Sequence, residues 1–294
     1  MSASPATFDG ALLRAPELQP EAILPRASRE NFPVALRWLP RERRDALMAV
    51  YGFARLADQI GDAYSGDRRA ALDALETELE AAFRGAARHR LLVDLEPWIE
   101  RHDLPPGPFH RLIEANRLDQ DLDEVANWEG LLDYCRLSAN PVGELVLAIF
   151  GQATPASIVA SDAVCTALQV VEHCQDVAED ARAGRIYLPA DDRSWLGCGV
   201  ADLVAPVASE PLRAVVAVQV RRARALLAEG APLVASLHGP ARLAVAAFVS
   251  GGIATCDALA AADFDPLRRP VRPRKGRIVR KAIALWLGGG VGTS

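Results

Sequence analysis

Hydrophobic residues recur along most of the chain at intervals of three and four, the spacing of an amphipathic helix, and no segment alternates with the period of two that strands show. The first strong helical pattern opens near Pro40, a favourable first-turn residue, and continues to about Asp62, before Ser65, Gly66 and Asp67 break it. The other predicted helices cover, in order, residues 68–85, 88–101, 128–150 with an interruption at Pro141, about 154–181, 210–228 and 240–262. These patterns predict an all-α protein.

Segments rich in proline and glycine separate the predicted helices. Residues 105–108 are expected to form a turn, and residues 183–208 to be irregular. No linker separates halves of different composition, so we predict one helical domain at residues 26–265. A flexible N-terminal segment, residues 1–25, would precede it, and a basic C-terminal tail or helix, residues 266–294, would follow it.

Composition narrows the classes of function. Half of the 294 residues are hydrophobic and 24% are charged, which is typical of a soluble globular protein with a large core. The net charge of −5 gives no support for nucleic-acid binding. The N-terminus lacks the pattern of a signal peptide, and the longest apolar run, residues 243–256, predicts a buried helix, so we expect a cytoplasmic protein. The five cysteines show no CxxC spacing and are expected to be reduced thiols.

Two predicted helices each carry a polar face that ends in two aspartates four residues apart. The members of the first face are Tyr51, Arg55, Asp58 and Asp62. The members of the second face are Gln169, Glu172, His173, Asp176 and Asp180. Mg²⁺ takes one or two carboxylates and leaves positions for phosphate oxygens, so two facing pairs would suit a diphosphate and would promote its departure. Arg55 and Arg185 would add charge-assisted hydrogen bonds to the phosphate.

The aspartate spacing also has a structural interpretation. Random placement of the 21 aspartates gives roughly one or two pairs at i, i+4. The sequence has a third such pair, Asp119 and Asp123, which we interpret as part of a solvated face or loop. From spacing alone, each of the other two pairs is more often structural than metal-binding.

Four segments, in order, resemble the squalene/phytoene synthase family. They are Asn31-Phe32-Pro33 followed by Leu39-Pro40, AVYGFARLADQIGD at 49–62, YCRLSANPVGELVL at 134–147 and LQVVEHCQDVAEDARAGRIYLP at 168–189. The resemblance implies the all-α isoprenoid synthase fold, a single-domain helical bundle around a central cavity. It also implies an enzyme that acts with Mg²⁺ on a prenyl diphosphate.

Within the family, the phrases ENFPVA, YCRLSANPVG and QDVAED are most similar to the hopanoid-pathway hydroxysqualene synthases. That similarity implies Mg²⁺-dependent conversion of presqualene diphosphate to hydroxysqualene and diphosphate, through ionisation, rearrangement of the cation and capture of water. One alternative is a head-to-head prenyl transferase that makes presqualene diphosphate, squalene or phytoene. An alternative of another class is a catalytically silent member that serves as a binding or assembly protein, against which the retained aspartates, Arg55 and Tyr187 argue.

The resemblance also implies roles for individual residues. The implied metal ligands are Asp58, Asp62, Glu172, Asp176 and Asp180. The implied catalytic residues are Tyr51, Tyr134 and Tyr187, of which Tyr187 would also contact diphosphate together with Arg55 and Arg185. The residues implied to shape the substrate pocket are Phe32, Val142 and Gln169.

The chain departs from the family pattern at three positions. Gln59 stands where many relatives have a second adjacent aspartate, and Glu172 where many have asparagine. Gln175 replaces the arginine that usually precedes the second aspartate pair in the condensing enzymes. The loss of this cation favours an enzyme that handles one diphosphate over one that joins two prenyl diphosphates.

The sequence leaves two questions open: the role of His173 and the use of a nicotinamide cofactor. His173 is either a base or diphosphate contact, or a packing residue, which is the commoner role of a lone histidine in an apolar helix. No dinucleotide-binding or P-loop motif appears, so a nicotinamide cofactor has no motif-level support. The sequence does not indicate an oligomeric state.

The C-terminal tail has a charge pattern of its own. Eight basic residues and no acidic one lie between Arg268 and Lys281, and an apolar run from Ile283 to Leu287 follows. A basic segment beside such a run is able to lie on an anionic membrane surface. A solvated basic helix that packs by its apolar side explains the pattern equally well.

Overall fold

The protein is helical throughout the part of the chain that the structure, a computed structural model, describes: residues 12–25, 39–273 and 275–286. Within these ranges no β-strand occurs, and Glu124 and Ile186 form an isolated parallel bridge. The predicted all-α class is therefore confirmed. The chain divides into two compact units, Met1–Asp121 (unit 1) and Leu122–Ser294 (unit 2), each of which is described by itself. The domain boundaries predicted near residues 25 and 265 stay a prediction.

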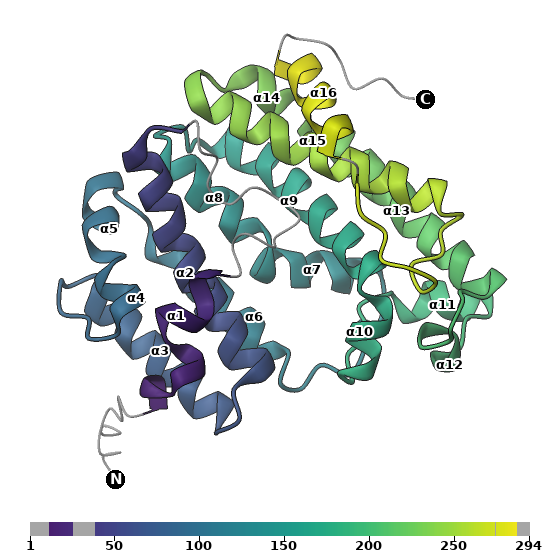
Figure 1. Ribbon diagram of the computed structural model, residues 1–294, viewed down its shortest axis with the longest axis horizontal. Helices are drawn as coiled ribbons and strands as arrows, with labels where there is room; N and C mark the ends of the chain where they lie inside the picture. Colours follow the sequence, from purple (N-terminus) through teal and green to yellow (C-terminus); the bar gives the residue numbers. More distant parts are fainter. Residues whose placement is uncertain (1–11, 26–38, 274, 287–294) are drawn as a thin grey trace. The chain divides into compact units, whose positions relative to one another are not determined.

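Unit 1 consists of short N-terminal turns and five further helices (Figure 1). They are η1 (Leu12–Arg14), η2 (Pro16–Leu18), α1 (Pro20–Ile23), α2 (Arg41–Ala63), α3 (Arg68–Ala82), α4 (Arg90–Val93), α5 (Glu96–His102) and α6 (Pro106–Leu118). The start of α2 and the break before α3 lie where the sequence predicts them, and the Asp67 side chain caps α3 by accepting from the Ala70 amide at 3.0 Å.

Helix α2 packs against α6 through its apolar face. The rings of Phe53 and Phe109 meet edge to face with centroids 5.0 Å apart, and both are fully buried. Gly61 lies so close to α6 that a Cβ atom there would come within 2.2 Å of Oδ1 of Asn116. This close approach brings polar residues of α6 beside the acidic end of α2.

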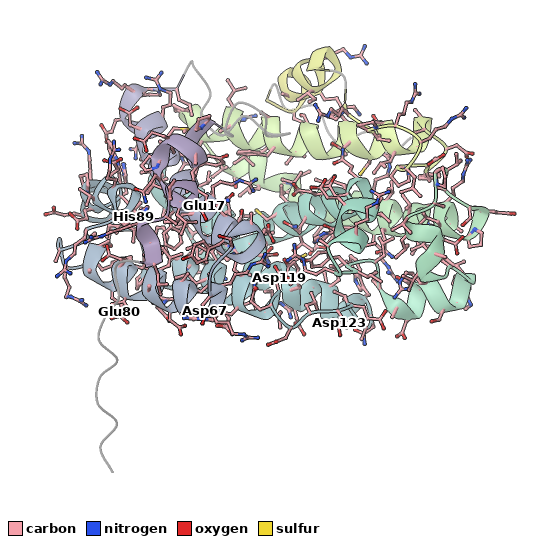
Figure 2. All side chains as sticks on the ribbon, turned by 60° about the horizontal axis from the view of Figure 1, so that its bottom comes forward. Glu17, Asp67, Glu80, His89, Asp119 and Asp123 are labelled. Carbon is pink, nitrogen blue, oxygen red and sulfur yellow. The ribbon has the colours of Figure 1, made fainter. Side chains whose placement is uncertain are left out.

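Unit 1 differs from the sequence prediction in three places. Residues 12–23, expected to be loose, form short helices in which Leu18 and Ile23 are fully buried. The buried His89 places Nε2 3.1 Å from the Leu18 carbonyl oxygen, which fixes this segment (Figure 2). The helix predicted at 88–101 is interrupted between α4 and α5. Residues 105–108, expected to be a turn, begin α6, because proline fits the first turn of a helix.

Unit 2 contains ten helices among the described residues (Figure 1). They are α7 (Trp128–Ser138), α8 (Asn140–Ile149), α9 (Pro155–Gln175), α10 (Val177–Arg182), α11 (Ala190–Leu196), α12 (Val200–Leu203), α13 (Glu210–Gly230), α14 (Pro232–Ser236), α15 (Gly239–Ala261) and α16 (Lys275–Trp286). The break between α7 and α8 was predicted. The segment 183–208 is less irregular than predicted, because it contains α11 and α12. The helix predicted at 154–181 is bent at Asp176, where α9 ends.

The core of unit 2 is built on α9, α13 and α15. Small residues allow these helices to approach closely: a Cβ atom at Gly230 would lie 2.5 Å from Cγ2 of Val164, and one at Gly252 would lie 2.8 Å from Cδ2 of Leu168. Helix α15 is long and apolar enough to cross a membrane by length and composition alone, but 67% of its most apolar window is buried inside the protein. That burial agrees with the predicted core helix.

Hydrogen bonds hold the segment after α15 against the rest of unit 2. The buried Asp265 accepts hydrogen bonds from the amides of Ala208, Leu267 and Arg268 at 3.0 to 3.2 Å. Gln175 donates from Nε2 to the Val271 carbonyl oxygen at 2.5 Å. The basic segment therefore begins against the C-terminal end of α9.

All five cysteines are free thiols, as predicted. Only Cys165 has part of its surface accessible, and the other four are buried. Burial raises the pKa of the Cys135 thiol to about 12 and those of Cys165, Cys198 and Cys256 to about 11.

Candidate functional site

The first polar face lies on α2 in unit 1. Arg55 Nη1 lies 3.5 Å from Asp58 Oδ2, and Asn116 of α6 donates from Nδ2 to Asp58 Oδ1 at 3.3 Å. The same amide nitrogen donates to the Leu112 carbonyl oxygen at 3.0 Å, so the Asn116 side chain is held in place. Asp58 thus has one cationic and one neutral donor, while Asp62, one turn further on, is exposed.

The environment of Asp58 favours its protonated form. Burial raises the pKa of this carboxyl to about 6, and the nearby Asp62 raises it further, while Arg55 and Asn116 oppose the shift. About 44% of the side chain is nevertheless accessible. A cation that neutralises this pair of carboxylates therefore has both an energetic reason to bind and room to approach.

The second polar face begins on α9 in unit 2 and crosses the bend at Asp176. His173 Nε2 lies 3.1 Å from Nε2 of Gln169, and His173 Nδ1 lies 3.4 Å from Oδ2 of Asp180 on α10. His173 is only 7% exposed. The spacing predicted from a single straight helix therefore spans two helices, and a side-chain contact joins them.

An aromatic pair adjoins this face. The Tyr187 ring stacks on the His173 imidazole with centroids 3.9 Å apart and planes at 20°. Tyr134 of α7 lies 4.9 Å from Tyr187 between ring centroids, and its hydroxyl contacts the Tyr187 hydroxyl at 3.4 Å. Both tyrosines are buried. Buried aromatic faces next to carboxylates form an environment that accommodates positive charge.

The loop after α10 places Arg185 and Tyr187. Gly184 has φ of 86°, a conformation that favours glycine, and reverses the chain at the end of α10. The Arg185 amide then donates to the Asp180 carbonyl oxygen at 3.0 Å, and the Ile186 amide donates to the Asp123 carbonyl oxygen at 2.9 Å. These backbone bonds fix the positions of both predicted diphosphate contacts.

Asp176 occupies the junction of α9 and α10. Burial raises its pKa to about 6, and the carboxylates of Asp180 and Glu179 raise it further, while His173 and Arg272 lower it. Arg272 belongs to the segment that Gln175 fastens through the neighbouring Val271. The C-terminal basic segment thus supplies positive charge near the second aspartate pair.

The structure places the predicted site residues in groups. In unit 1, α2 carries Tyr51, Arg55, Asp58 and Asp62. In unit 2, hydrogen bonds and ring contacts bring together Tyr134, Gln169, Asp180 and Tyr187 around His173. Glu172 lies partly buried on α9, and Val142 is 38% exposed on α8. Phe32 lies outside the described residues, and the roles of all these residues stay predictions.

The sequence analysis missed two polar residues, Asn116 and Gln120, and left the role of His173 open. Asn116 lies on α6, a helix that the sequence analysis did not predict, and Gln120 lies just past its end and donates to the Gly61 carbonyl oxygen at 3.1 Å. Their i, i+4 spacing is the signal that would have found them. The third aspartate pair, Asp119 and Asp123, ends α6 and begins a loop, as expected (Figure 2).

The donor sets of the two aspartate pairs match magnesium. Among the residues that the structure describes, no three His, Cys, Asp or Glu side chains gather into a ready-made metal site. Mg²⁺ does not require one, since it keeps several waters and takes one or two carboxylates together with substrate phosphate. Burial is the main cause of the raised pKa values of Asp58 and Asp176, and the second carboxylate of each pair raises them further.

The chain is similar in sequence and in structure to several known proteins. The hydroxysqualene synthase of Zymomonas mobilis is 34% identical over 265 residues, which are 88% of this chain and 88% of that protein. The presqualene diphosphate synthase of Rhodopseudomonas palustris is 34% identical over 198 residues, or 66% of this chain and 71% of that protein. The crystal structure of squalene synthase HpnC from Alicyclobacillus acidocaldarius has a TM-score of 0.75 and 43% identity, and the match covers 82% of this chain and 92% of that one.

The helical architecture is therefore the isoprenoid synthase fold, as predicted. A family model described as squalene/phytoene synthase matches residues 25–277. The chain belongs to the squalene/phytoene synthase family.

Proposed function

We propose that this protein converts presqualene diphosphate to hydroxysqualene and diphosphate. The observation that carries the proposal is the 34% identity to a hydroxysqualene synthase along 88% of both chains. In this reaction the carbon–oxygen bond breaks and its electron pair leaves with the diphosphate. The resulting cation rearranges, and a water molecule forms the new carbon–oxygen bond and releases a proton, so no reductant is consumed.

The two aspartate pairs are the proposed Mg²⁺ ligands, with Glu172 beside the second pair. Bound Mg²⁺ would neutralise the charge that develops on the leaving diphosphate. Asp58 and Asp180 are suited to hold the ion because each accepts a hydrogen bond that fixes its carboxylate. Arg55 and Arg185 are the proposed hydrogen-bond donors to the diphosphate.

The buried aromatic pair is the proposed environment of the cation. Tyr134 and Tyr187 present ring faces tilted at 41° to each other, with their hydroxyls in contact, and such aromatic faces stabilise positive charge without acting as strong nucleophiles. Their burial supports a reaction from which water is excluded until the rearrangement is complete. Contacts of the substrate with Tyr51, Phe32, Val142 and Gln169 stay predictions from the sequence.

Gln175 supports the use of a single diphosphate. Its side chain donates to the Val271 carbonyl oxygen and so performs a structural task rather than a cationic one. The second candidate function is the condensation of two prenyl diphosphates, which the 34% identity to a presqualene diphosphate synthase favours. A condensing enzyme would have to bind a second diphosphate without the arginine that precedes the second aspartate pair in relatives.

The decisive experiment incubates the purified full chain with presqualene diphosphate and Mg²⁺ in water enriched in ¹⁸O, without NADPH. Mass spectrometry should detect hydroxysqualene that carries one ¹⁸O atom. Formation of squalene, or no turnover, would contradict the proposal. Farnesyl diphosphate is supplied alone in a parallel reaction, and its conversion to presqualene diphosphate would support the condensing alternative instead.

Matched aspartate variants test the metal site. Asp176→Asn should reduce turnover by at least 100-fold, because it removes a ligand charge. The control is Asp191→Asn, which changes an exposed aspartate on α11 and should leave turnover unchanged. Near-normal activity of the Asp176 variant would exclude this aspartate pair as the metal site.

A further inference from the structure

A buried histidine connects a proposed metal ligand to the proposed aromatic site. His173 lies on α9 and is 7% exposed, so its ring nitrogens must find partners inside the protein. The two partners are side chains on either side of the helix bend: Gln169, one turn before His173 on α9, and Asp180 on α10. His173 is thus the link across the point where the second polar face changes helix.

The two contacts define one neutral tautomer of the imidazole. The Asp180 carboxylate accepts only, so the proton belongs on Nδ1, which lies 3.4 Å from Oδ2. Nε2 then accepts from the Gln169 amide nitrogen, 3.1 Å away. The chain of donors runs from Gln169 through His173 to Asp180 and leaves neither ring nitrogen unsatisfied.

The ring face of His173 has a separate task. It stacks on Tyr187 at a centroid distance of 3.9 Å, and Tyr134 lies 5.9 Å from it. Tyr187 lies in a loop, where helix geometry does not hold the side chain. The stacked imidazole therefore limits the rotation of a ring that faces the other tyrosine.

We infer that His173 is a positioning residue with two separable functions, which rests on the function proposed above. Its Nδ1–H orients the Asp180 carboxylate for a divalent cation, and its ring face orients Tyr187. Partners that hydrogen-bond to metal ligands typically change metal affinity by about 10- to 100-fold when removed. The stacking of His173 on Tyr187, in contrast, should affect the reaction but not the affinity for the metal ion.

Two variants separate these functions. His173→Phe keeps a ring against Tyr187 but removes the donor to Asp180. His173→Asn keeps an amide N–H near the position of Nδ1 but removes the stacked ring. Binding of Mn²⁺ is measured by electron paramagnetic resonance in the presence of inorganic diphosphate, which requires no turnover.

We expect His173→Phe to weaken Mn²⁺ binding about 10-fold and His173→Asn to retain the wild-type affinity within about 3-fold. The Asn variant should instead lose turnover of presqualene diphosphate at saturating Mg²⁺. His238→Phe, a change at an exposed histidine, is the matched control and should alter neither quantity. Wild-type Mn²⁺ affinity in the Phe variant, or equal loss in both variants, would overturn the inference.

A measurement on the unaltered protein covers the case in which a variant does not fold. Nitrogen-15 NMR of the imidazole groups should show His173 as the neutral Nδ1–H tautomer, and an Nε2–H tautomer would contradict the assignment. Failure of the proposed reaction would appear differently: wild-type protein would bind Mn²⁺ and show the expected tautomer, but would not produce hydroxysqualene.

Discussion

Asn116 shows how one neutral side chain supports a charged site. It is 6% exposed, and its amide nitrogen is shared between Asp58 and the Leu112 carbonyl oxygen. A leucine of similar size would leave the Asp58 oxygen without this donor and the Leu112 carbonyl without one of its contacts. The carboxylate would then be free to turn away from a metal position.

We therefore predict that Asn116→Leu raises the Mg²⁺ concentration needed for half-maximal activity about 10-fold. The free energy of unfolding should fall by about 1 kcal/mol because buried acceptors lose a donor. Activity is measured as a function of Mg²⁺, and stability by urea unfolding. The control is Asp94→Asn, at an exposed aspartate of the same unit. An unchanged Mg²⁺ dependence would show that Asn116 has no part in the metal site.

Individual site residues were predictable to different degrees. The stripe of Arg55, Asp58 and Asp62 follows from spacing because α2 is one uninterrupted helix. The role of His173 was left open because its two partners lie on different helices, and a bend at Asp176 has no proline or glycine to mark it. Sequence spacing identifies neighbours on one helix, but it does not predict contacts across a bend.

At the scale of elements, the contact between α2 and α6 depends on the absence of a side chain. Gly61→Ala would place Cβ 2.2 Å from Oδ1 of Asn116, which is buried and cannot move away freely. We expect a loss of about 1 to 3 kcal/mol in the free energy of unfolding, measured by urea denaturation. Gly107→Ala, where a Cβ would meet nothing within 4 Å, is the control and should not destabilise. Equal stability of the two variants would contradict this packing.

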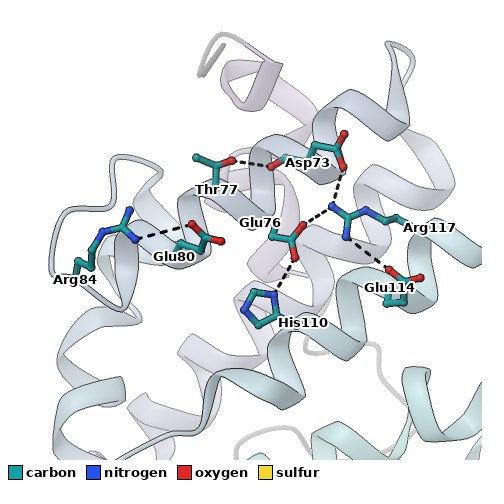
Figure 3. A network of polar contacts seen from close by, with 8 residues as sticks. All are labelled: Asp73, Glu76, Thr77, Glu80, Arg84, His110, Glu114 and Arg117. Atoms are coloured by element: carbon teal, nitrogen blue, oxygen red, sulfur yellow. Dashed lines mark hydrogen bonds and ion pairs between the residues drawn. The ribbon is translucent and has the colours of Figure 1, made fainter. Parts of the chain in front are cut away.

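A polar network joins α3 to α6 within unit 1 (Figure 3). Glu76 accepts from Arg117 at 2.6 Å and contacts His110 at 3.0 Å, while Arg117 also reaches Asp73 at 2.7 Å. The hydrogen bond from Arg117 holds the pKa of Glu76 below its usual value of 4.5. A carboxyl with a lowered pKa stabilises the folded state above the unfolded pKa, and this contribution disappears as the pH falls through the folded pKa.

Arg117→Met should therefore cost about 1 kcal/mol at pH 7, a modest value because Glu76 is partly accessible. The difference from wild type should shrink below pH 4.5 and vanish once Glu76 is protonated. Urea unfolding over a pH series measures it. Arg84→Met removes an exposed pair with Glu80 at 3.9 Å and should have no measurable effect. A difference that persists at low pH would point to packing by the Arg117 stem instead.

The long helices could be predicted from periodicity, and the short ones could not. The ends of α2, α13 and α15 lie within two residues of the prediction, because their long apolar faces mark them. Helix α6 was missed since its prolines resemble a turn signal, and α11 and α12 lie among glycines. These short elements are stabilised by tertiary contacts rather than by local preference.

At the scale of the whole molecule, the fold class followed from the helical pattern, but the division into two units did not. The boundary between Asp121 and Leu122 lies in a charged stretch without glycine or proline. Both units show the same helical spacing of apolar and charged residues, so the sequence pattern does not separate them. The contacts that define each unit arise only when distant helices pack.

The basic segment after α15 offers a test at the same scale. Arg268, Arg269 and Arg280 are exposed, while Lys281 pairs with Asp257 at 3.2 Å and so anchors α16. If the segment binds membranes, the protein should co-sediment with anionic vesicles and not with zwitterionic ones. Charge reversal to glutamate at Arg268, Arg269 and Arg280 together should abolish this binding. Equal sedimentation of both proteins would favour the solvated basic helix.

Because the thiols are buried, their chemical labelling can be used to follow the unfolding of this protein. A thiol whose pKa lies near 11 or 12 supplies almost no thiolate at neutral pH, and the thiolate is the form that alkylating reagents attack. Labelling of the four buried thiols in the native protein should therefore be slow and limited by local opening. Because Cys135, Cys174 and Cys256 lie on α7, α9 and α15, mass spectrometry of the labelled peptides would time the release of each helix separately. The cysteines thus act as built-in reporters of the order in which unit 2 comes apart.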